Sequence, residues 1–176
     1  MAAFASSYIP TVASTVTRSA DVASVNTLSP FYNAVEGTIY AEWSMVGSSV
    51  GTGYPAISQF DDTTGTNYIA IRQDGVNDSR RYGIVQTSST VAAMLSNTAE
   101  SLSANTVLKA ALAYKANDFA FTRGSTLGTS SSGAIPAVTN LKLGRNDAGT
   151  YINAHVGRIA YYPVRLTNAQ LQALTS

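Results

Sequence analysis

The last quarter of the chain, residues 151–176, constrains the fold more than any other segment. Its apolar residues Val156, Ile159 and Tyr161 stand three and then two positions apart, whereas the side chains of a regular strand repeat every two residues. We therefore predict a strand with a β-bulge at Gly157-Arg158, because one extra residue returns the apolar side chains to a single face of the sheet.

A short helix is predicted directly after this strand. Pro163 has no N–H group to pair with a neighbour, so it ends the strand. Thr167 is a favoured N-cap residue. Leu171 and Leu174 follow at helical spacing and would fold back on the body of the domain.

The rest of the chain has the pattern of an all-β protein. Alternating apolar and polar segments recur between turn-rich clusters, which is typical of a β-sandwich. In residues 38–46 the alternation places Trp43 on the apolar face, and we predict that it lies in the core. The other predicted strands are Tyr68–Gln73, Arg81–Thr87, Val91–Ser96, Val107–Tyr114 and short segments around Phe119, Phe121, Leu141 and Leu143. Two antiparallel sheets packed in jelly-roll order satisfy this pattern.

The connections and the length complete this prediction. Asp74-Gly75 is a signal for a type I′ hairpin, and Ser125–Gly133 has the composition of a mobile polar loop. A chain of 176 residues corresponds to one domain, residues 1–176, in which residues 1–15 form an N-terminal arm. We expect this arm to pack on the sandwich or on a neighbouring copy.

The composition excludes several classes of protein. Lys and Arg number 11 against 10 Asp and Glu, so there is no overall field to attract nucleic acid. The absence of cysteine excludes disulfides and thiolate metal sites. The N-terminus lacks the features of a secretory signal peptide, and no apolar run approaches the ~18 residues that span a bilayer.

Motifs at both ends of the chain resemble those of a known family. The C-terminal stretch contains Arg158-Ile159-Ala160-Tyr161 and Leu166-Thr167-Asn168, and the N-terminal stretch contains Ser7-Tyr8-Ile9-Pro10-Thr11. These motifs resemble concanavalin A-like, laminin-G-like jelly-roll domains, in particular those of tailed-phage virion proteins. Two departures are Ala154, where glycine is usual, and Thr122-Arg123-Gly124, where an Asn-Gly turn is usual.

The resemblance implies a jelly-roll β-sandwich that serves in recognition or display on a phage tail fibre, tail tip or capsid surface. It implies a virion protein that assembles in the bacterial cytoplasm. Its partners would be a host-surface glycan or other virion proteins, and it leaves room for a homo-oligomer, a trimer if the domain is carried on a fibre.

One motif matches a nucleophile elbow by its letters alone. Gly47-Ser48-Ser49-Val50-Gly51 fits Gly-x-Ser-x-Gly, but the elbow needs a helix after the serine. Gly53 and Pro55 follow here, and then another strand is expected. We interpret the match as a coincidence in a chain rich in serine and glycine.

The carboxylates and the histidine do not form a hydrolytic pattern either. Retaining glycosidases need two carboxyl groups about 5–5.5 Å apart, and inverting enzymes about 6.5–9.5 Å. Glu36 and Glu42 share a face but are separated by roughly 20 Å of strand. His155, which is the only histidine, lies beside the predicted bulge without an identifiable partner. We predict that the domain is not an enzyme.

Two turns have residues that could hold calcium. Asp61, Asp62 and Asn67 offer carboxylate and amide oxygens, and Asn146-Asp147 is a second candidate. The alternative is ordinary turn chemistry, in which Asp and Asn bond to their own backbone. No other cofactor is indicated.

The tyrosine content indicates where a partner would bind. The chain has 10 tyrosines against one tryptophan and five phenylalanines. A tyrosine ring stacks on the apolar face of a sugar, and its hydroxyl can bond to it. The candidate glycan-binding residues, in or beside turn clusters, are Tyr54, Arg80, Arg81, Tyr82, Asn146, Asp147 and Tyr151. A structural or decoration module stays open as an alternative, and a glycan hydrolase has the least support.

Overall fold

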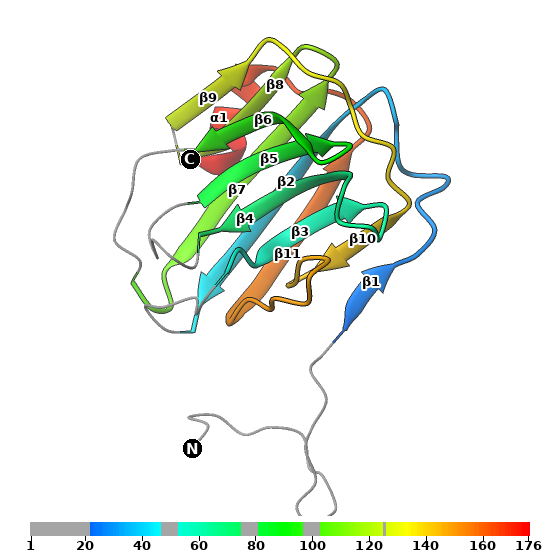
Figure 1. The fold of residues 1–176 in the computed structure, drawn as a ribbon. Coiled ribbons are helices and arrows are strands. Elements are labelled where there is room, and N and C mark those ends of the chain that lie inside the picture. The colour runs from blue at the N-terminus through cyan, green and yellow to red at the C-terminus, as the bar shows by residue number, and fades with distance from the viewer. Residues whose placement is uncertain (1–21, 47–52, 75–80, 97–102, 125) are drawn as a thin grey trace, which may run out of the picture.

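Two antiparallel β-sheets lie face to face in the computed structural model of the chain, as Figure 1 shows. The structure describes residues 22–46, 53–74, 81–96, 103–124 and 126–176. The strands, in chain order, are β1 (Ala23–Val25), β2 (Glu36–Met45), β3 (Ala56–Asp61), β4 (Tyr68–Gln73), β5 (Arg81–Thr87), β6 (Thr90–Ser96), β7 (Val107–Lys115), β8 (Phe119–Arg123), β9 (Thr126–Ser130), β10 (Asn140–Leu143) and β11 (Ala154–Tyr162). The predicted β-sandwich is therefore confirmed.

Sequence-distant strands become neighbours in both sheets. The six-stranded sheet has the order β1-β10-β3-β4-β5-β6, and the five-stranded sheet has the order β11-β2-β7-β8-β9. Both sheets thus combine strands from the two halves of the chain. Because β10 pairs with β3, the loop after β10 lies next to the start of β3.

The C-terminal segment folds as its sequence predicts. The register of β11 against β2 shifts between Val156 and Arg158, which is the expected bulge, and the strand ends before Pro163. Helix α1 (Asn168–Thr175) follows. Thr167 caps it in a capping box, and the fully buried Leu171 anchors it on the outer side of the five-stranded sheet.

The prediction of a mobile loop at Ser125–Gly133 is wrong for most of that segment. Residues Thr126–Ser130 form β9, the edge strand of the five-stranded sheet. β9 pairs with β8 in regular register, from Phe119 opposite Ser130 to Arg123 opposite Thr126. An edge strand with one partly solvated face tolerates hydroxyl side chains, so the Ser/Thr-rich composition did not prevent strand formation.

The core fills the space between the sheets. Trp43 is 1% exposed, which confirms the prediction that it is buried. Tyr32 stacks on Tyr114 and Tyr161 with ring centroids 6.1 and 5.9 Å apart, and the hydroxyls of Tyr114 and Tyr161 are hydrogen-bonded at 2.8 Å. These aromatic contacts tie the segment between β1 and β2 to the five-stranded sheet.

Gly83 marks a close approach of the two sheets. A Cβ built there would stand 2.7 Å from Leu112 Cδ1 and 2.8 Å from Phe121 Cδ2, and both neighbours are fully buried. We expect Gly83→Ala to lower the free energy of unfolding by about 1–3 kcal/mol, because the core would have to shift. Gly128→Ala is the control, since its nearest contact is Leu95 Cβ at 3.8 Å. Equal stability of the two variants in urea denaturation would contradict the prediction.

Several sequence-based predictions fall outside the described residues. These are the N-terminal arm (residues 1–15), the serine motif at residues 47–51 and the second residue of the Asp74-Gly75 turn. Among the residues that the structure does describe, no helix has the length and apolar character needed to cross a membrane.

Candidate functional site

Polar side chains line the outer face of the six-stranded sheet. Side chains alternate between the two faces of a strand, so the neighbours of core residues point outward. The register places Lys142 beside Gln59 and Arg72 beside Tyr82 on this outer face, and Asp61 follows Gln59 two positions along β3. Four adjacent strands, β10, β3, β4 and β5, therefore contribute to one polar surface.

These side chains form a continuous network. Lys142 Nζ lies 2.9 and 2.8 Å from the two carboxylate oxygens of Asp61. Gln59 Nε2 donates to Asp61 Oδ2 at 3.1 Å and to Asp147 Oδ1 at 2.8 Å. Arg72 Nη2 donates to Gln59 Oε1 at 2.7 Å and lies 3.5 Å from Asp147 Oδ1. The network thus joins the sheet to the loop that follows β10.

The loop after β10 is fixed by its own hydrogen bonds. Asn146 Oδ1 accepts from the Thr150 N–H at 2.8 Å, and Asn146 Nδ2 donates to the Tyr54 carbonyl at 3.1 Å. Asp147 Oδ2 lies against Gly65, where the Cβ of any other residue would overlap it. The loop therefore bridges the segment before β3 and the turn after β3.

Two tyrosines stand at the surface of this region. Tyr54 is 46% exposed, and its ring meets the Tyr82 ring edge-on with centroids 6.4 Å apart. Tyr151, at the end of the loop, is 39% exposed and bridges to Arg145 through the backbone. An exposed aromatic ring next to immobilised polar groups can hold a ligand that has both an apolar face and hydroxyls.

Tyr82 is a supporting residue of this site. Burial raises the pKa of its phenol to about 12, although the adjacent Arg72 guanidinium acts in the opposite direction. The hydroxyl is therefore protonated at neutral pH. With 8% of its surface exposed, Tyr82 mainly holds the Tyr54 ring in place.

The structure brings together two of the segments that carry predicted glycan-binding residues and places the other candidates elsewhere. Asn146 contacts the backbone of Tyr54, just before β3, and Asp147 and Tyr151 belong to the same loop after β10 as Asn146. Tyr82 does not lie on an exposed rim, because it occupies the second position of β5 and is buried. Asn146 is also buried, at 6% exposure, because its side chain serves the loop's own hydrogen bonds. Arg80 lies outside the described residues.

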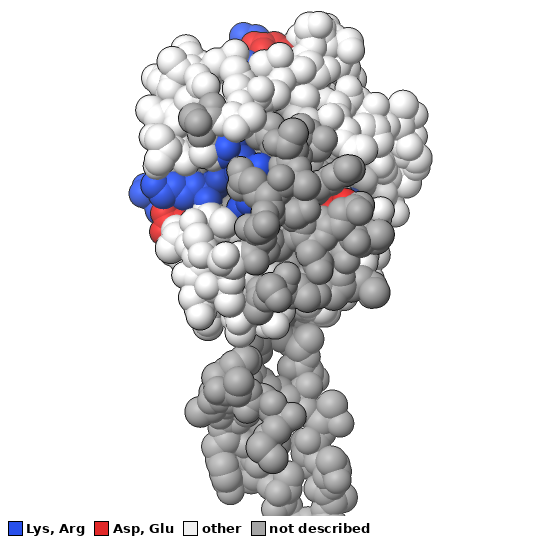
Figure 2. All heavy atoms as spheres, turned by 90° about the vertical axis from the view of Figure 1, so that its left-hand side faces the viewer, with Lys and Arg blue, Asp and Glu red and all other residues white. Residues whose placement is uncertain are grey.

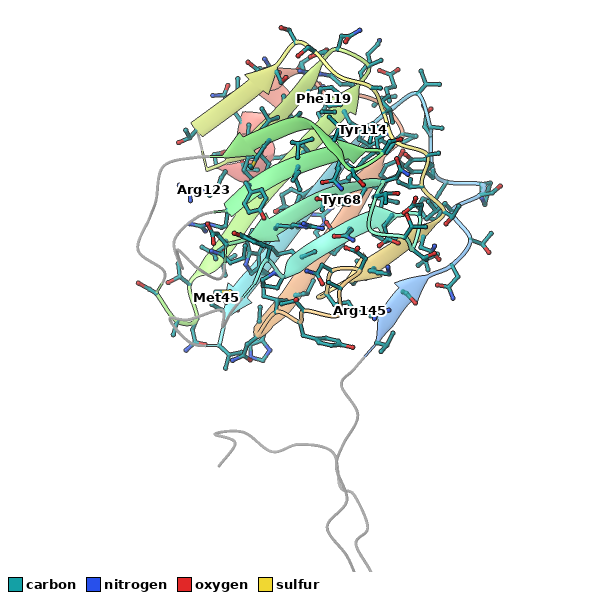
Figure 3. All side chains as sticks on the ribbon, viewed as in Figure 1. Met45, Tyr68, Tyr114, Phe119, Arg123 and Arg145 are labelled. Carbon is teal, nitrogen blue, oxygen red and sulfur yellow. The ribbon has the colours of Figure 1, made fainter. Side chains whose placement is uncertain are left out.

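Arg81 does not lie on the polar outer face of the six-stranded sheet. It is adjacent to Tyr82 on β5, so its side chain points to the opposite, inner face of the sheet, at the open end of the space between the two sheets. There it lines a hollow of about 390 Å³ together with Lys109 and Arg123. Arg81 and Arg123 are 2% and 4% exposed. Figure 2 shows Lys and Arg side chains gathered on this end of the sandwich, and Figure 3 shows Arg123 there, away from the middle of the sheet.

Sequence reasoning missed four residues of the outer face: Gln59, Tyr68, Arg72 and Lys142. Arg72 lies over the Tyr68 ring, with its guanidinium carbon 4.1 Å from the ring centroid. A signal was available, because Tyr68 and Arg72 alternate with Ile69 and Ile71 in β4, which separates an outer face from a core face. The same signal was available for Lys142, which stands between the core-facing Leu141 and Leu143 in β10.

The first calcium candidate has protein partners instead. The Asp61 carboxylate pairs with Lys142, and Asp62 accepts from Thr64 and from Asn67 Nδ2 at 2.8 Å. Burial opposes ionisation of Asp62, but the bonds from Asn67 and Thr64 outweigh it and lower the pKa to about 2. Within the described ranges, no group of three or more His, Cys, Asp or Glu side chains could hold a metal ion. The observed contacts are those of ordinary turn chemistry.

Of the residues considered for catalysis, the two glutamates have protein partners and the histidine lies at the surface. Glu36 pairs with Lys115 at 3.5 Å, and Glu42 accepts from the Tyr40 hydroxyl at 3.0 Å. His155 is exposed on β11. The absence of catalysis stays a prediction, and the contacts of these residues give no reason to revise it.

Comparison with known proteins shows the fold. No protein-family model matches the chain, and no curated protein matches it either. The Ruminococcus gnavus IT-sialidase CBM40 bound to α2,6-sialyllactose superposes with a TM-score of 0.64 and 14% identity, over 82% of this chain and 85% of that chain. The fold is a jelly-roll β-sandwich. Its sandwich of two antiparallel sheets and its short C-terminal helix agree with the fold predicted from the sequence.

Other solved structures share this jelly roll. Trypanosoma rangeli sialidase matches with a TM-score of 0.59 and 13% identity, over 81% of this chain but only 22% of that chain. A native heptameric SAP-like pentraxin from Limulus polyphemus matches with a TM-score of 0.58 and 10% identity, over 83% of this chain and 73% of that chain. At these identities the likeness concerns the fold.

Proposed function

We propose that this jelly-roll domain is a non-catalytic module that binds glycans through the site around Tyr54. The observation that carries the proposal is the half-exposed Tyr54 ring beside polar groups that are already held in place. A pyranose ring has an apolar face that stacks on an aromatic ring and hydroxyls that bond to fixed polar groups. Tyr54 supplies the first feature, and Asp147 supplies the second.

The rigidity of the site supports this function. Asp147 is held by Gln59 at 2.8 Å, and the Tyr54 backbone is held by Asn146 at 3.1 Å. Side chains that are immobilised before the ligand arrives lose little conformational entropy on binding, which favours affinity for small polar ligands. The site therefore needs little rearrangement to receive a sugar.

The similarity of fold also supports a glycan ligand. The Ruminococcus gnavus CBM40 domain that superposes on this chain was solved with α2,6-sialyllactose and also with α2,3-sialyllactose. A jelly roll of this kind thus provides a scaffold on which a sugar-binding site can be built. The proposal for this chain depends on its own residues, because a fold by itself does not determine a function.

The proposed setting is the surface of a phage virion, where the glycan would belong to the host cell. The resemblance of the motifs near both ends of the chain to tailed-phage virion proteins supports this setting. Adsorption of the labelled domain to host cells, and its competition by purified surface polysaccharide, would test it.

The binding site is tested by Tyr54→Ala. We expect it to weaken binding on a glycan array by about tenfold or more, because the stacking surface is lost, while the fold is kept since Tyr54 is 46% exposed. Tyr151→Ala should also weaken binding. Tyr54→Phe keeps the ring and should retain most of the affinity.

Val164→Ala is the matched control. Val164 is 48% exposed and follows β11 of the five-stranded sheet, away from the site, and its carbonyl accepts from Thr38 of the neighbouring strand β2. It should bind like the parent. Glycan binding that survives both Tyr54→Ala and Tyr151→Ala would refute this site, and no binding to any glycan would favour a structural or decoration module of the virion.

A further inference from the structure

We infer that the site around Tyr54 selects neutral sugars over acidic ones. This inference rests on the proposed function and specifies its ligand class. It departs from the ligand of the Ruminococcus gnavus domain with the same fold, because sialyllactose carries a carboxylate. The reasons lie in the charges of the described residues at the site.

The two cations of the outer face are already neutralised. Lys142 is 7% exposed and contacts both carboxylate oxygens of the fully buried Asp61. Arg72 is 8% exposed and is engaged by Gln59 at 2.7 Å, by Asp147 at 3.5 Å and by the Tyr68 ring. The network therefore has two positive and two negative side chains, and its cations are covered by protein.

Asp147 is the more exposed partner of the Arg72–Asp147 ion pair. Asp147 has 18% of its side chain exposed, twice the 9% of its partner Arg72. Its Oδ1 takes the contacts from Gln59 and Arg72. Its Oδ2 lies against Gly65, and no donor among the described residues bonds to it. An ionised carboxylate offers about four acceptor positions, so Asp147 retains capacity for sugar hydroxyls.

The Asp147 carboxylate would weaken the binding of an acidic sugar by electrostatic repulsion. A sialic or uronic acid carboxylate beside the Tyr54 ring would be repelled by Asp147, and like charges brought together at a binding site reduce affinity. To bond Arg72, the same carboxylate would have to displace Asp147 from the guanidinium. A neutral hexose needs neither change, because its hydroxyls donate to the carboxylate.

The cationic hollow does not alter this selectivity. Arg81 and Arg123 point into the open end of the space between the two sheets, whereas Tyr82 and Arg72 point outward. Acidic ligands attracted to Arg81, Lys109 and Arg123 would therefore bind at that hollow and not at the site around Tyr54. Such binding would not depend on Tyr54.

The test compares matched neutral and acidic glycans. The parent domain is applied to an array that includes lactose, α2,6-sialyllactose and further pairs that differ by one sialic or uronic acid. We expect the neutral member of each bound pair to be favoured by about tenfold or more. The preference should decrease at high salt, because part of it is the repulsion from a partly exposed carboxylate.

Asp147→Asn identifies the cause. Asparagine keeps an acceptor for Gln59 but removes the charge, so the neutral-to-acidic ratio should decrease toward one. The melting temperature is measured alongside, because the change also removes the carboxylate beside Arg72, and the ratio is compared at a temperature at which both proteins are folded. Lys115→Gln is the control, since it changes a charge that lies on β7 and is 52% exposed. It should leave the ratio unchanged.

The outcomes separate the two proposals. Tighter binding of acidic glycans that is lost in Tyr54→Ala would overturn the neutral selectivity and leave glycan binding intact. Neutral preference that Asp147→Asn does not change would also overturn the inference, because another group would then discriminate. Failure to bind any glycan would overturn the proposed function, and the selectivity with it.

Discussion

Lys142→Met is expected to lower the free energy of unfolding by about 3–5 kcal/mol, because it leaves the Asp61 carboxylate buried without its cation. Asp61 is fully buried, and Lys142 Nζ lies 2.8 Å from its Oδ2. Gln59 and the Thr63 N–H would still donate to the carboxylate, but neither supplies a positive charge. Urea denaturation followed by circular dichroism measures the difference.

An exposed ion pair and a double variant provide the controls. Lys115→Met breaks the pair with Glu36, in which the lysine is 52% exposed, and should cost less than about 1 kcal/mol. Adding Asp61→Asn to Lys142→Met should recover part of the lost stability, since the uncompensated charge is gone. If Lys142→Met costs no more than Lys115→Met, the buried pair is not needed to stabilise the sheet.

The sequence predicted those parts of the fold that depend on local patterns. The alternation in Tyr68–Gln73 and Arg81–Thr87 identified β4 and β5 with the bounds that the structure shows. The spacing around Gly157 identified the bulge, and Thr167 identified the start of the helix. In each case, neighbouring residues in the chain carry the information.

The prediction failed where partners far away in the chain decide the structure. β1 has only three residues, all exposed, which is too short for a recognisable alternation, and it pairs with the edge that β10 offers. Leu127 is the only large apolar residue of β9, which otherwise consists of hydroxyl residues and glycine, and the strand forms against β8. Such edge strands obtain their order from a neighbour's hydrogen bonds, which local composition does not reveal.

The same distinction holds for the site. Turn composition selected Tyr54, Asp147 and Tyr151 as candidates, because aromatic and amide-rich loops are suited to binding. That these loops meet depends on β10 lying beside β3, which follows from the sheet order. Arg72 and Lys142 were missed because they lie on strands, whereas turn composition indicates only residues in or beside loops.

Trp43→Ala should lower the free energy of unfolding by about 3–5 kcal/mol, as truncation of a large buried aromatic residue does. The Trp43 side chain is 1% exposed, on the inner face of β2. Its buried Nε1 has no hydrogen-bond partner among the described residues, so the loss comes from packing and not from a broken hydrogen bond. Because this is the only tryptophan, unfolding must be followed by circular dichroism and not by tryptophan fluorescence.

Two further variants separate packing from other causes. Trp43→Phe keeps an aromatic ring in the core and should lose clearly less stability than Trp43→Ala, because a smaller cavity remains. Val156→Ala alters the cross-strand partner of Trp43 on β11, which is 40% exposed, and should cost only a few tenths of a kcal/mol up to about 1 kcal/mol. If Trp43→Ala unfolded at nearly the same urea concentration as the parent, the side chain would have to lie at the surface. The sandwich would then need a core that does not include Trp43, and its indole ring would become a second candidate platform for a sugar.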